Sequence, residues 1–136
     1  MEERAQAVEI RAAEGVADVE TARKLMREYG EFLVTNPAGA VNLCLAGYEA
    51  EMAGLPAPYV APGGLLLAWV DGEAAGCVGV KALPRGGKLE IKRLWVREGF
   101  RGLRLGRRLM EAAIGLAREA GAEAVYLDTV PAAMPE

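Results

Sequence analysis

Histidine is absent from this 136-residue chain, and cysteine occurs only twice. Without histidine the sequence has no Ser-His-Asp or Cys-His catalytic group, and it lacks the commonest ligand of zinc and haem. The two cysteines, Cys44 and Cys77, form no CxxC motif and stand in apolar stretches, so we expect both to be core residues. We therefore expect no metal cofactor and no disulfide framework.

Long apolar runs and a strong net charge are also missing. The longest apolar run, around Leu65–Val70, is far too short to span a bilayer. Residues Met1–Gln6 are charged and lack the apolar core of a signal peptide. The net charge of −3 argues against general binding of nucleic acid or anionic membranes. We expect a single soluble domain over residues 1–136, located in the cytoplasm.

Apolar periodicity and turn residues divide the chain into eight elements. The expected strands cover 7–12, 65–70, 75–83, 88–97 and 124–130, and the expected helices cover 17–34, 40–53 and 104–120. Asp71-Gly72 predicts a tight hairpin turn, and Gly121 is placed as the C-terminal cap of the last helix. The order β-α-α-β-β-β-α-β predicts an α/β fold with a mixed sheet flanked by helices. Its first strands are antiparallel, and its last two strands, which enclose a helix, are parallel.

The most informative segment runs from residue 88 to residue 108, where a strand, an arginine- and glycine-rich turn and a helix follow one another. A helix that begins near Arg104 leaves its first backbone N–H groups without internal partners, and these groups attract anions. Gly102 and Gly106 let an anion approach the backbone closely. Four arginines crowd the positive end of the helix, where a cation is normally disfavoured: Arg101, Arg104, Arg107 and Arg108. Arginines that only solvate a surface helix are the alternative, but the glycines and the preceding strand favour a site for a multiply charged anion.

Known anion-binding patterns narrow the class of ligand. The P-loop pattern and the G-x-G-x-x-G of dinucleotide-binding proteins are both absent. The segment resembles the acyl-CoA signature of the GNAT superfamily of N-acetyltransferases, [Arg/Gln]-x-x-Gly-x-[Gly/Ala]. Arg101 and Gly106 match the ends of this signature. Arg104 stands where the middle glycine is commonest, which removes a flexible position but adds a cation beside the expected pyrophosphate.

The resemblance extends over roughly residues 8–134. Further segments are similar to patterns of one bacterial branch of the superfamily: Glu90-x-Lys92-Arg93-Leu94-x-Val96, Cys77-x-Gly79, Glu51-x-Ala53-x-Leu55-Pro56 and Leu127-Asp128-Thr129. The resemblance implies a GNAT-like fold and the transfer of an acetyl group from acetyl-CoA to a primary amine by direct attack. The acceptor is expected to be the amine of a small molecule or a peptide.

The resemblance also implies where acetyl-CoA binds. The backbone of the 94–96 segment would hydrogen-bond the pantetheine arm, and one N–H there would polarise the thioester carbonyl. The N–H groups of residues 103–107 would hold the pyrophosphate, and the strands 88–97 and 124–130 would splay apart to admit the cofactor. The expected cofactor-binding residues are Leu94, Trp95, Val96, Arg101, Gly102, Leu103, Arg104, Leu105, Gly106 and Arg107.

Glu90 is the expected general base, acting through a water molecule. Alternation along the strand places it on the same side as three other residues, namely Lys92, Leu94 and Val96. Trp95 then lies on the opposite face, where we expect it to pack and not to stack on adenine. The alternative is that Glu90 forms an ordinary ion pair with Lys92 or Arg93.

Other polar side chains are open to two interpretations each. Asp128 is a second carboxylate candidate, but its position near a strand end also suits a residue that fixes a loop. Glu51 could face a substrate amine, although a solvated helix face is the favoured interpretation. Tyr29, Tyr48 and Tyr59 could line the acceptor pocket, but Tyr29 and Tyr48 occupy apolar helix stripes, which favours core positions.

In the family, a further helix and two strands follow the strand that matches 124–130, and that helix usually carries a tyrosine that protonates the leaving thiolate. The sequence stops at Glu136, before that helix, so no residue inherits the role. Val125, Leu127 and Val130 are then expected on an exposed sheet edge. Further chain, or a second protomer of a homodimer, would cover this edge.

Two hypotheses compete with an enzyme. One is a non-catalytic acyl-CoA-binding or regulatory module of the same fold, which keeps the anion-binding turn and lacks the proton donor. The other is a phosphate-binding scaffold for a different nucleotide.

Overall fold

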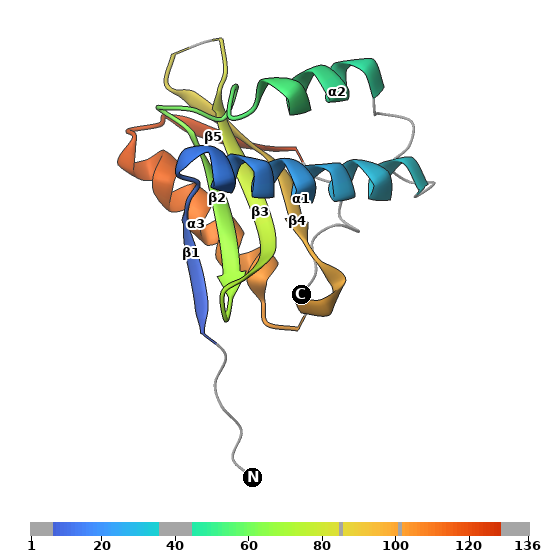
Figure 1. The fold of residues 1–136 in the computed structure, drawn as a ribbon. Coiled ribbons are helices and arrows are strands. Elements are labelled where there is room, and N and C mark those ends of the chain that lie inside the picture. Colours follow the sequence, from blue (N-terminus) through green and yellow to red (C-terminus); the bar gives the residue numbers. More distant parts are fainter. Residues whose placement is uncertain (1–6, 36–44, 85, 101, 129–136) are drawn as a thin grey trace.

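The structure, a computed structural model, describes residues 7–35, 45–84, 86–100 and 102–128. Its elements are β1 (Val8–Ala12), α1 (Gly15–Thr35), α2 (Leu45–Gly54), β2 (Gly64–Val70), β3 (Glu73–Ala82), β4 (Lys88–Val96), the 3-10 helix η2 (Glu98–Phe100), α3 (Leu105–Glu119) and β5 (Ala124–Asp128). The strands form one sheet in the order β1-β2-β3-β4-β5, in which β1 to β4 are antiparallel and β5 runs parallel to β4 (Figure 1). The predicted element order and the parallel last pair are confirmed.

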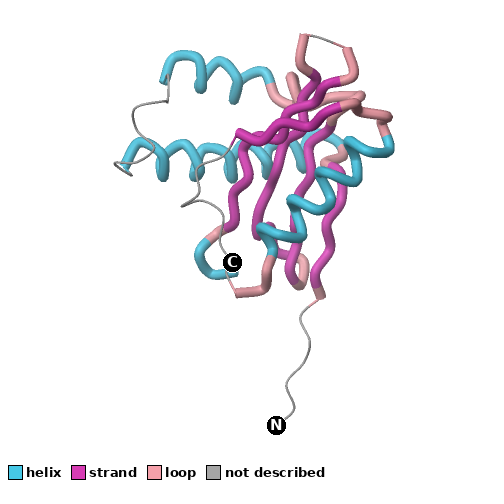
Figure 2. Tube along the Cα trace, turned by 180° about the vertical axis from the view of Figure 1, so that it is seen from behind, coloured by secondary structure: helices cyan, strands magenta, loops and turns pink. Residues whose placement is uncertain are grey.

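The helices cover opposite faces of the sheet. Helices α1 and α2 lie on one face, called the α1 face below, and α3 crosses the other, called the α3 face (Figures 1 and 2). The strands send apolar side chains to both faces, because successive residues point in opposite directions. Leu67 and Trp95 pack with the core of the α1 face, whereas Val78 and Ile91 pack with that of the α3 face.

Helix α1 follows the predicted amphipathic pattern. Its buried side chains recur at helical spacing: Ala22, Leu25, Met26, Tyr29 and Leu33. The second predicted helix, 40–53, corresponds to α2, and its residues 40–44 lie outside the described part of the chain. None of the helices in the described ranges is both long and apolar enough to cross a membrane.

Two turn predictions are confirmed by the backbone. Asp71 and Gly72 have φ values of 51° and 85° in the turn between β2 and β3, as a two-residue hairpin of this type requires. Gly121 has φ 81° just after α3, and its N–H donates to the carbonyl of Arg118. The N–H of Ala122 donates to the carbonyl of Ala117 at 3.1 Å, which completes a Schellman motif.

Strand β4 contains a bulge at Arg93. Its pairing with β3 passes from Gly79↔Lys92 to Cys77↔Trp95, so that two residues of β4 oppose the single residue Val78. Arg93 has a φ of 61°, in the left-handed region that non-glycine residues rarely adopt.

The bulge corrects the prediction of which β4 side chains share a face. Leu89 and Ile91 are buried on the α3 face, so Glu90 points to the α1 face. The extra residue shifts the alternation, and Leu94 and Val96 also pack on the α3 face, whereas Trp95 packs on the α1 face. The prediction that Glu90 lies with Leu94 and Val96, and opposite Trp95, was therefore wrong. The prediction assumed that side chains alternate between the two faces along the whole of β4, without a bulge.

The β5 edge is exposed, as predicted. Val125 and Leu127 are 37% and 57% exposed, and Tyr126 between them is 47% exposed. Val130, the third residue expected there, lies outside the described residues. The backbone groups of such a sheet edge can pair with a further strand, which would also cover these apolar side chains.

Close packing between β3 and β4 leads to a stability prediction. A Cβ atom at Gly76 would lie 2.6 Å from the backbone oxygen of Trp95, whereas one at Gly115 in α3 would meet nothing within 4 Å. We expect Gly76→Ala to lower the free energy of unfolding by about 1–3 kcal/mol, because it overpacks the sheet. The matched control Gly115→Ala should raise it by roughly 0.5–1 kcal/mol, since alanine loses less entropy in a helix. Urea denaturation measures both, and equal stability of the two variants would contradict this packing.

Candidate active site

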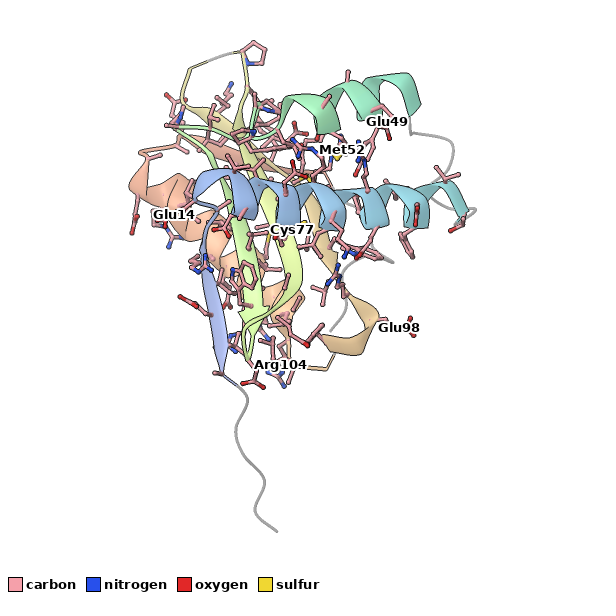
Figure 3. The ribbon with its side chains drawn as sticks, viewed as in Figure 1. Glu14, Glu49, Met52, Cys77, Glu98 and Arg104 are labelled. Atoms are coloured by element: carbon pink, nitrogen blue, oxygen red, sulfur yellow. The ribbon has the colours of Figure 1, made fainter. Side chains whose placement is uncertain are left out.

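The start of α3 lies at the end of the sheet where β4 finishes, and Figure 3 labels Arg104 there. The first helical hydrogen bond runs from the N–H of Arg108 to the carbonyl of Arg104 at 3.0 Å. The N–H groups of residues 105–107 therefore precede the hydrogen-bonded part of the helix. The Arg104 side chain makes no capping hydrogen bond within the described chain. This geometry can accept an anion.

Arg104 itself adopts a left-handed conformation, with φ 59° and ψ 32°. This conformation costs a non-glycine residue about 1 kcal/mol or more. The position is the one at which the family signature most often has glycine, and the backbone explains that preference. The arginine keeps the geometry that glycine would provide and adds a guanidinium group beside it. Gly102, two residues earlier, also has a positive φ, of 96°.

Cationic side chains surround this helix start. Arg104, Arg107 and Arg108 are exposed. Arg107 lies 3.5 Å from Glu111, but this exposed pair contributes little stability and leaves the guanidinium group accessible. Leu105 and Gly106 are buried and anchor the turn. Arg101, the first residue of the signature, lies outside the described residues, and Leu103 is partly buried against the α3-face core.

The backbone of Leu94–Val96 leads directly towards this helix start through η2. Leu94 and Val96 are fully buried, and the ring of Trp95 packs 5.3 Å from that of Phe32. The packing role expected for Trp95 is confirmed. Parallel pairing of β4 with the described part of β5 extends from Lys88↔Ala124 to Lys92↔Asp128. The predicted splaying of the two strands would begin beyond this point, and residues 129–130 of the predicted last strand lie outside the described residues.

Glu90 occupies the α1 face in a row across three strands. It lies opposite Lys81 on β3 and opposite Tyr126 on β5, and it is partly buried. Its carboxylate joins no ion pair with another residue in the described ranges. The alternative pairing of Glu90 with Arg93 is wrong, because Arg93 binds a different carboxylate.

That carboxylate belongs to Glu51 of α2. Arg93 donates from Nε to Oε2 at 2.9 Å and from Nη2 to Oε1 at 2.7 Å, and the hydroxyl of Tyr59 donates to Oε2 at 2.6 Å. Burial opposes ionisation of Glu51, but the hydrogen bonds from Arg93 and Tyr59 outweigh it and lower the pKa of the carboxyl group. The favoured interpretation of Glu51 as a solvated residue was wrong, and its oxygens are already occupied, so it is not poised to receive an amine.

A second bidentate pair joins α1 to the end of β4. Arg97 donates to Glu28 from Nε at 3.0 Å and from Nη2 at 2.8 Å, and Trp95 donates from Nε1 at 3.3 Å. Burial opposes ionisation of Glu28, but these hydrogen bonds lower its pKa overall. The two pairs join residues 42 and 69 positions apart, so no local spacing in the sequence could identify them.

Three of the four tyrosines and the described cysteine are core residues. Tyr29, Tyr48 and Tyr59 are 2%, 5% and 2% exposed, which confirms the core interpretation of Tyr29 and Tyr48. Burial raises the pKa of Tyr48 and of Tyr59. Cys77 is fully buried, as predicted, and burial raises the pKa of its thiol to about 12. A thiolate nucleophile is therefore excluded there at neutral pH.

Two further predictions from the sequence concern side chains that the structure does not describe. Cys44 lies outside the described residues, and the side chain of Asp128 is not described, so both stay predictions. Within the described ranges, no group of three or more acidic or cysteine side chains is arranged to hold a metal ion.

Comparison with known proteins identifies the family. Residues 23–135 match the Acetyltransferase (GNAT) family. An N-acetyltransferase of Schizosaccharomyces pombe, itself uncharacterized, is 31% identical over 131 residues, which cover 94% of this chain and 76% of the relative. The GNAT acetyltransferase of Staphylococcus aureus Mu50 shares the fold, with a TM-score of 0.69 and 18% identity over 91% of this chain and 74% of its own. An aminoglycoside N-acetyltransferase solved in complex with CoA gives a TM-score of 0.62 and 19% identity over 97% of this chain and 83% of its own. The chain thus belongs to the GNAT family and is an N-acetyltransferase.

Proposed function

We propose that this protein transfers the acetyl group of acetyl-CoA to a primary amine by direct attack of the neutral amine on the thioester. The observation that carries the proposal is the start of α3, where N–H groups that have no partner among the described residues meet exposed arginines. A pyrophosphate supplies the multiple negative charge that such a site attracts. An aminoglycoside N-acetyltransferase with the same fold has been solved with CoA bound, which supports this choice of donor.

The donor would lie along β4 and end at α3. The N–H groups of residues 103–107 hold the pyrophosphate, with Arg101, Arg104 and Arg107 beside it. The backbone of Leu94–Val96 holds the pantetheine arm and polarises the thioester carbonyl. One such donor is worth a few kcal/mol in transition-state stabilisation when it is aimed at the developing oxyanion.

The reaction forms a C–N bond, breaks the C–S bond and moves two protons. The attacking amine must be neutral, so a base accepts one proton from its ammonium form. After the attack the nitrogen loses a second proton, which balances the proton that the departing thiolate takes up. Glu90 is the proposed base, acting through a water molecule from the α1 face. The backbone groups of β4 lie in the plane of the sheet, so a carboxylate on the α1 face is compatible with a thioester bound along the strand. The proton donor to the thiolate is assigned to no described residue.

Two measurements, one of CoA binding and one of turnover, test the proposal. Calorimetry measures the affinity for CoA, and thiol release from acetyl-CoA measures transfer to a panel of amines from small molecules and peptides. Release of CoA with acetylation of an amine supports the proposal. CoA binding with no turnover on any amine would instead favour the non-catalytic acyl-CoA-binding module. Stronger thermal protection by ATP than by CoA would favour a different nucleotide.

Arg104→Gly is expected to have opposite effects on stability and on cofactor binding. Glycine relieves the left-handed strain, so the free energy of unfolding should rise by about 1 kcal/mol. Loss of the guanidinium group should raise the KM for acetyl-CoA by roughly fivefold to tenfold, as the removal of one charge-assisted contact predicts. Arg118→Gln, at the other end of α3, is the matched control and should leave this KM unchanged. A KM that does not respond to Arg104→Gly would remove this residue from the cofactor site.

Glu90→Gln is expected to lower kcat most strongly at low pH. Without the carboxylate, the reaction depends on the fraction of amine that is already neutral, and this fraction grows as pH rises. A loss of about a hundredfold at the low end of the pH profile, shrinking towards high pH, is the expected pattern. Glu73→Gln, an exposed carboxylate on β3, is the control and should match the wild type. A Glu90→Gln profile that parallels the wild type at every pH would leave Glu90 without a role as base.

A further inference from the structure

Two carboxylate–guanidinium pairs bracket the segment of β4 that is proposed to bind the pantetheine arm. Glu51 binds Arg93 immediately before Leu94–Val96, and Glu28 binds Arg97 immediately after it. Bidentate pairing fixes both the distance and the direction of the partners. The side chains of Arg93 and Glu51 are 14% and 17% exposed, against 28% and 31% for Arg97 and Glu28. The first pair is therefore the better shielded anchor.

The backbone of Arg93 needs such an anchor. Its left-handed φ of 61° carries a conformational cost that glycine would avoid. Contacts of its side chain and carbonyl oppose this cost: Glu51 holds the guanidinium group, and the thiol of Cys77 donates to the carbonyl at 3.4 Å. The peptide plane between Arg93 and Leu94 turns with the Arg93 backbone. The conformation of Arg93 consequently sets the direction of the Leu94 N–H group.

Further contacts of Arg93 and Glu51 extend across the α1 face. The ring of Tyr48 lies 4.8 Å from the Arg93 guanidinium group, and the Tyr48 hydroxyl donates to the carbonyl of Met26 in α1. Tyr59, in the segment between α2 and β2, donates to Glu51. One network therefore joins α1, α2 and this segment to the bulge of β4.

Stability alone gives a weak account of this network. Removing two charges from water costs about as much as their attraction returns, so apolar residues of similar size often stabilise a protein equally well. What an ion pair adds over apolar packing here is a fixed orientation. The oriented group is the strand segment that must polarise the thioester.

We propose that Glu51 is a positioning residue of the acetyl transfer: it holds Arg93 in the left-handed conformation and thereby aims the backbone N–H group of Leu94 at the thioester carbonyl. Glu51 acts through Arg93 and does not touch the substrate. The inference rests on the proposed function, because it requires acetyl-CoA along β4.

Infrared spectroscopy of bound acetyl-CoA, isotope-labelled at the thioester carbonyl, tests the direction of this N–H group without any acceptor. Hydrogen bonds to the carbonyl lower its stretching frequency. Glu51→Gln keeps the shape of the side chain but removes its charge. Arg93→Lys keeps the positive charge but removes the planar guanidinium group that makes two parallel hydrogen bonds. We expect the carbonyl band to shift towards that of free acetyl-CoA in both variants, while the Kd for CoA stays within about twofold because the start of α3 is intact.

The matched control is Arg27→Ala. Arg27 pairs with Glu49 at 3.1 Å, so this variant also removes an ion pair between α1 and α2, but one that does not reach β4. Its carbonyl band should equal that of the wild type. Tyr59→Phe removes only the hydroxyl that donates to Glu51, so it remains informative if the charge-altering variants fail to fold. It should shift the band less, in the same direction.

Turnover provides the second measurement, with the best acceptor of the amine panel. Glu51→Gln should lower kcat per CoA-binding site by about tenfold or more and leave the KM for acetyl-CoA unchanged. A small misalignment of a group that stabilises the transition state lowers the rate of the chemical step by factors of this size. A pair that only stabilises the fold would lower the unfolding temperature and leave the carbonyl band and kcat per site unchanged, and this result would overturn the proposal. If the wild type binds no acetyl-CoA, the proposed function itself fails and this inference fails with it.

Discussion

The bulge of β4 at Arg93 is the constraint on which the rest of the site depends. Before this residue the strand pairs with β5 and turns Glu90 towards the α1 face. After it, Leu94 and Val96 face α3, and the chain continues through η2 to the start of that helix. A regular strand would place the proposed base and the side chains of Leu94 and Val96 on one face. The bulge places Glu90 on the opposite face from these two side chains, and only the backbone of β4 connects them.

Charge is concentrated where the proposed chemistry requires it. The chain as a whole carries a net charge of −3, yet the start of α3 combines exposed arginines with N–H groups that donate to no other part of the described chain. Local attraction of a compact anion is compatible with a weakly acidic surface, because exposed charges farther away are screened by salt. The left-handed Arg104 connects this electrostatic property to the backbone, since it holds a conformation that glycine usually supplies.

Local patterns in the sequence were sufficient to predict most of the fold. The period of apolar residues identified the helices, and Asp71-Gly72 and Gly121 marked turns that the backbone confirms. The start of α3 was predictable for the same reason, because its glycines and arginines lie within a few positions of one another. The bulge was not, because neither glycine nor proline marks Arg93.

The ion pairs between residues far apart in the sequence could not be predicted from sequence periodicity. Glu51 resembles a solvated helix residue until Arg93, which is 42 positions away, is placed beside it in space. Glu28 and Arg97, 69 positions apart, gave no local signal either. The faces assigned to Glu90 and Trp95 were wrong for a related reason, since one inserted residue reverses the alternation that follows it.

A crystal structure with CoA bound would show where the pyrophosphate lies. We expect its oxygens to accept hydrogen bonds from the N–H groups of residues 105–107, with the Arg104 guanidinium group beside them and the pantetheine arm along Leu94–Val96. A structure in which CoA occupies another surface, while these N–H groups bind water or the protein's own carboxylates, would contradict this expectation.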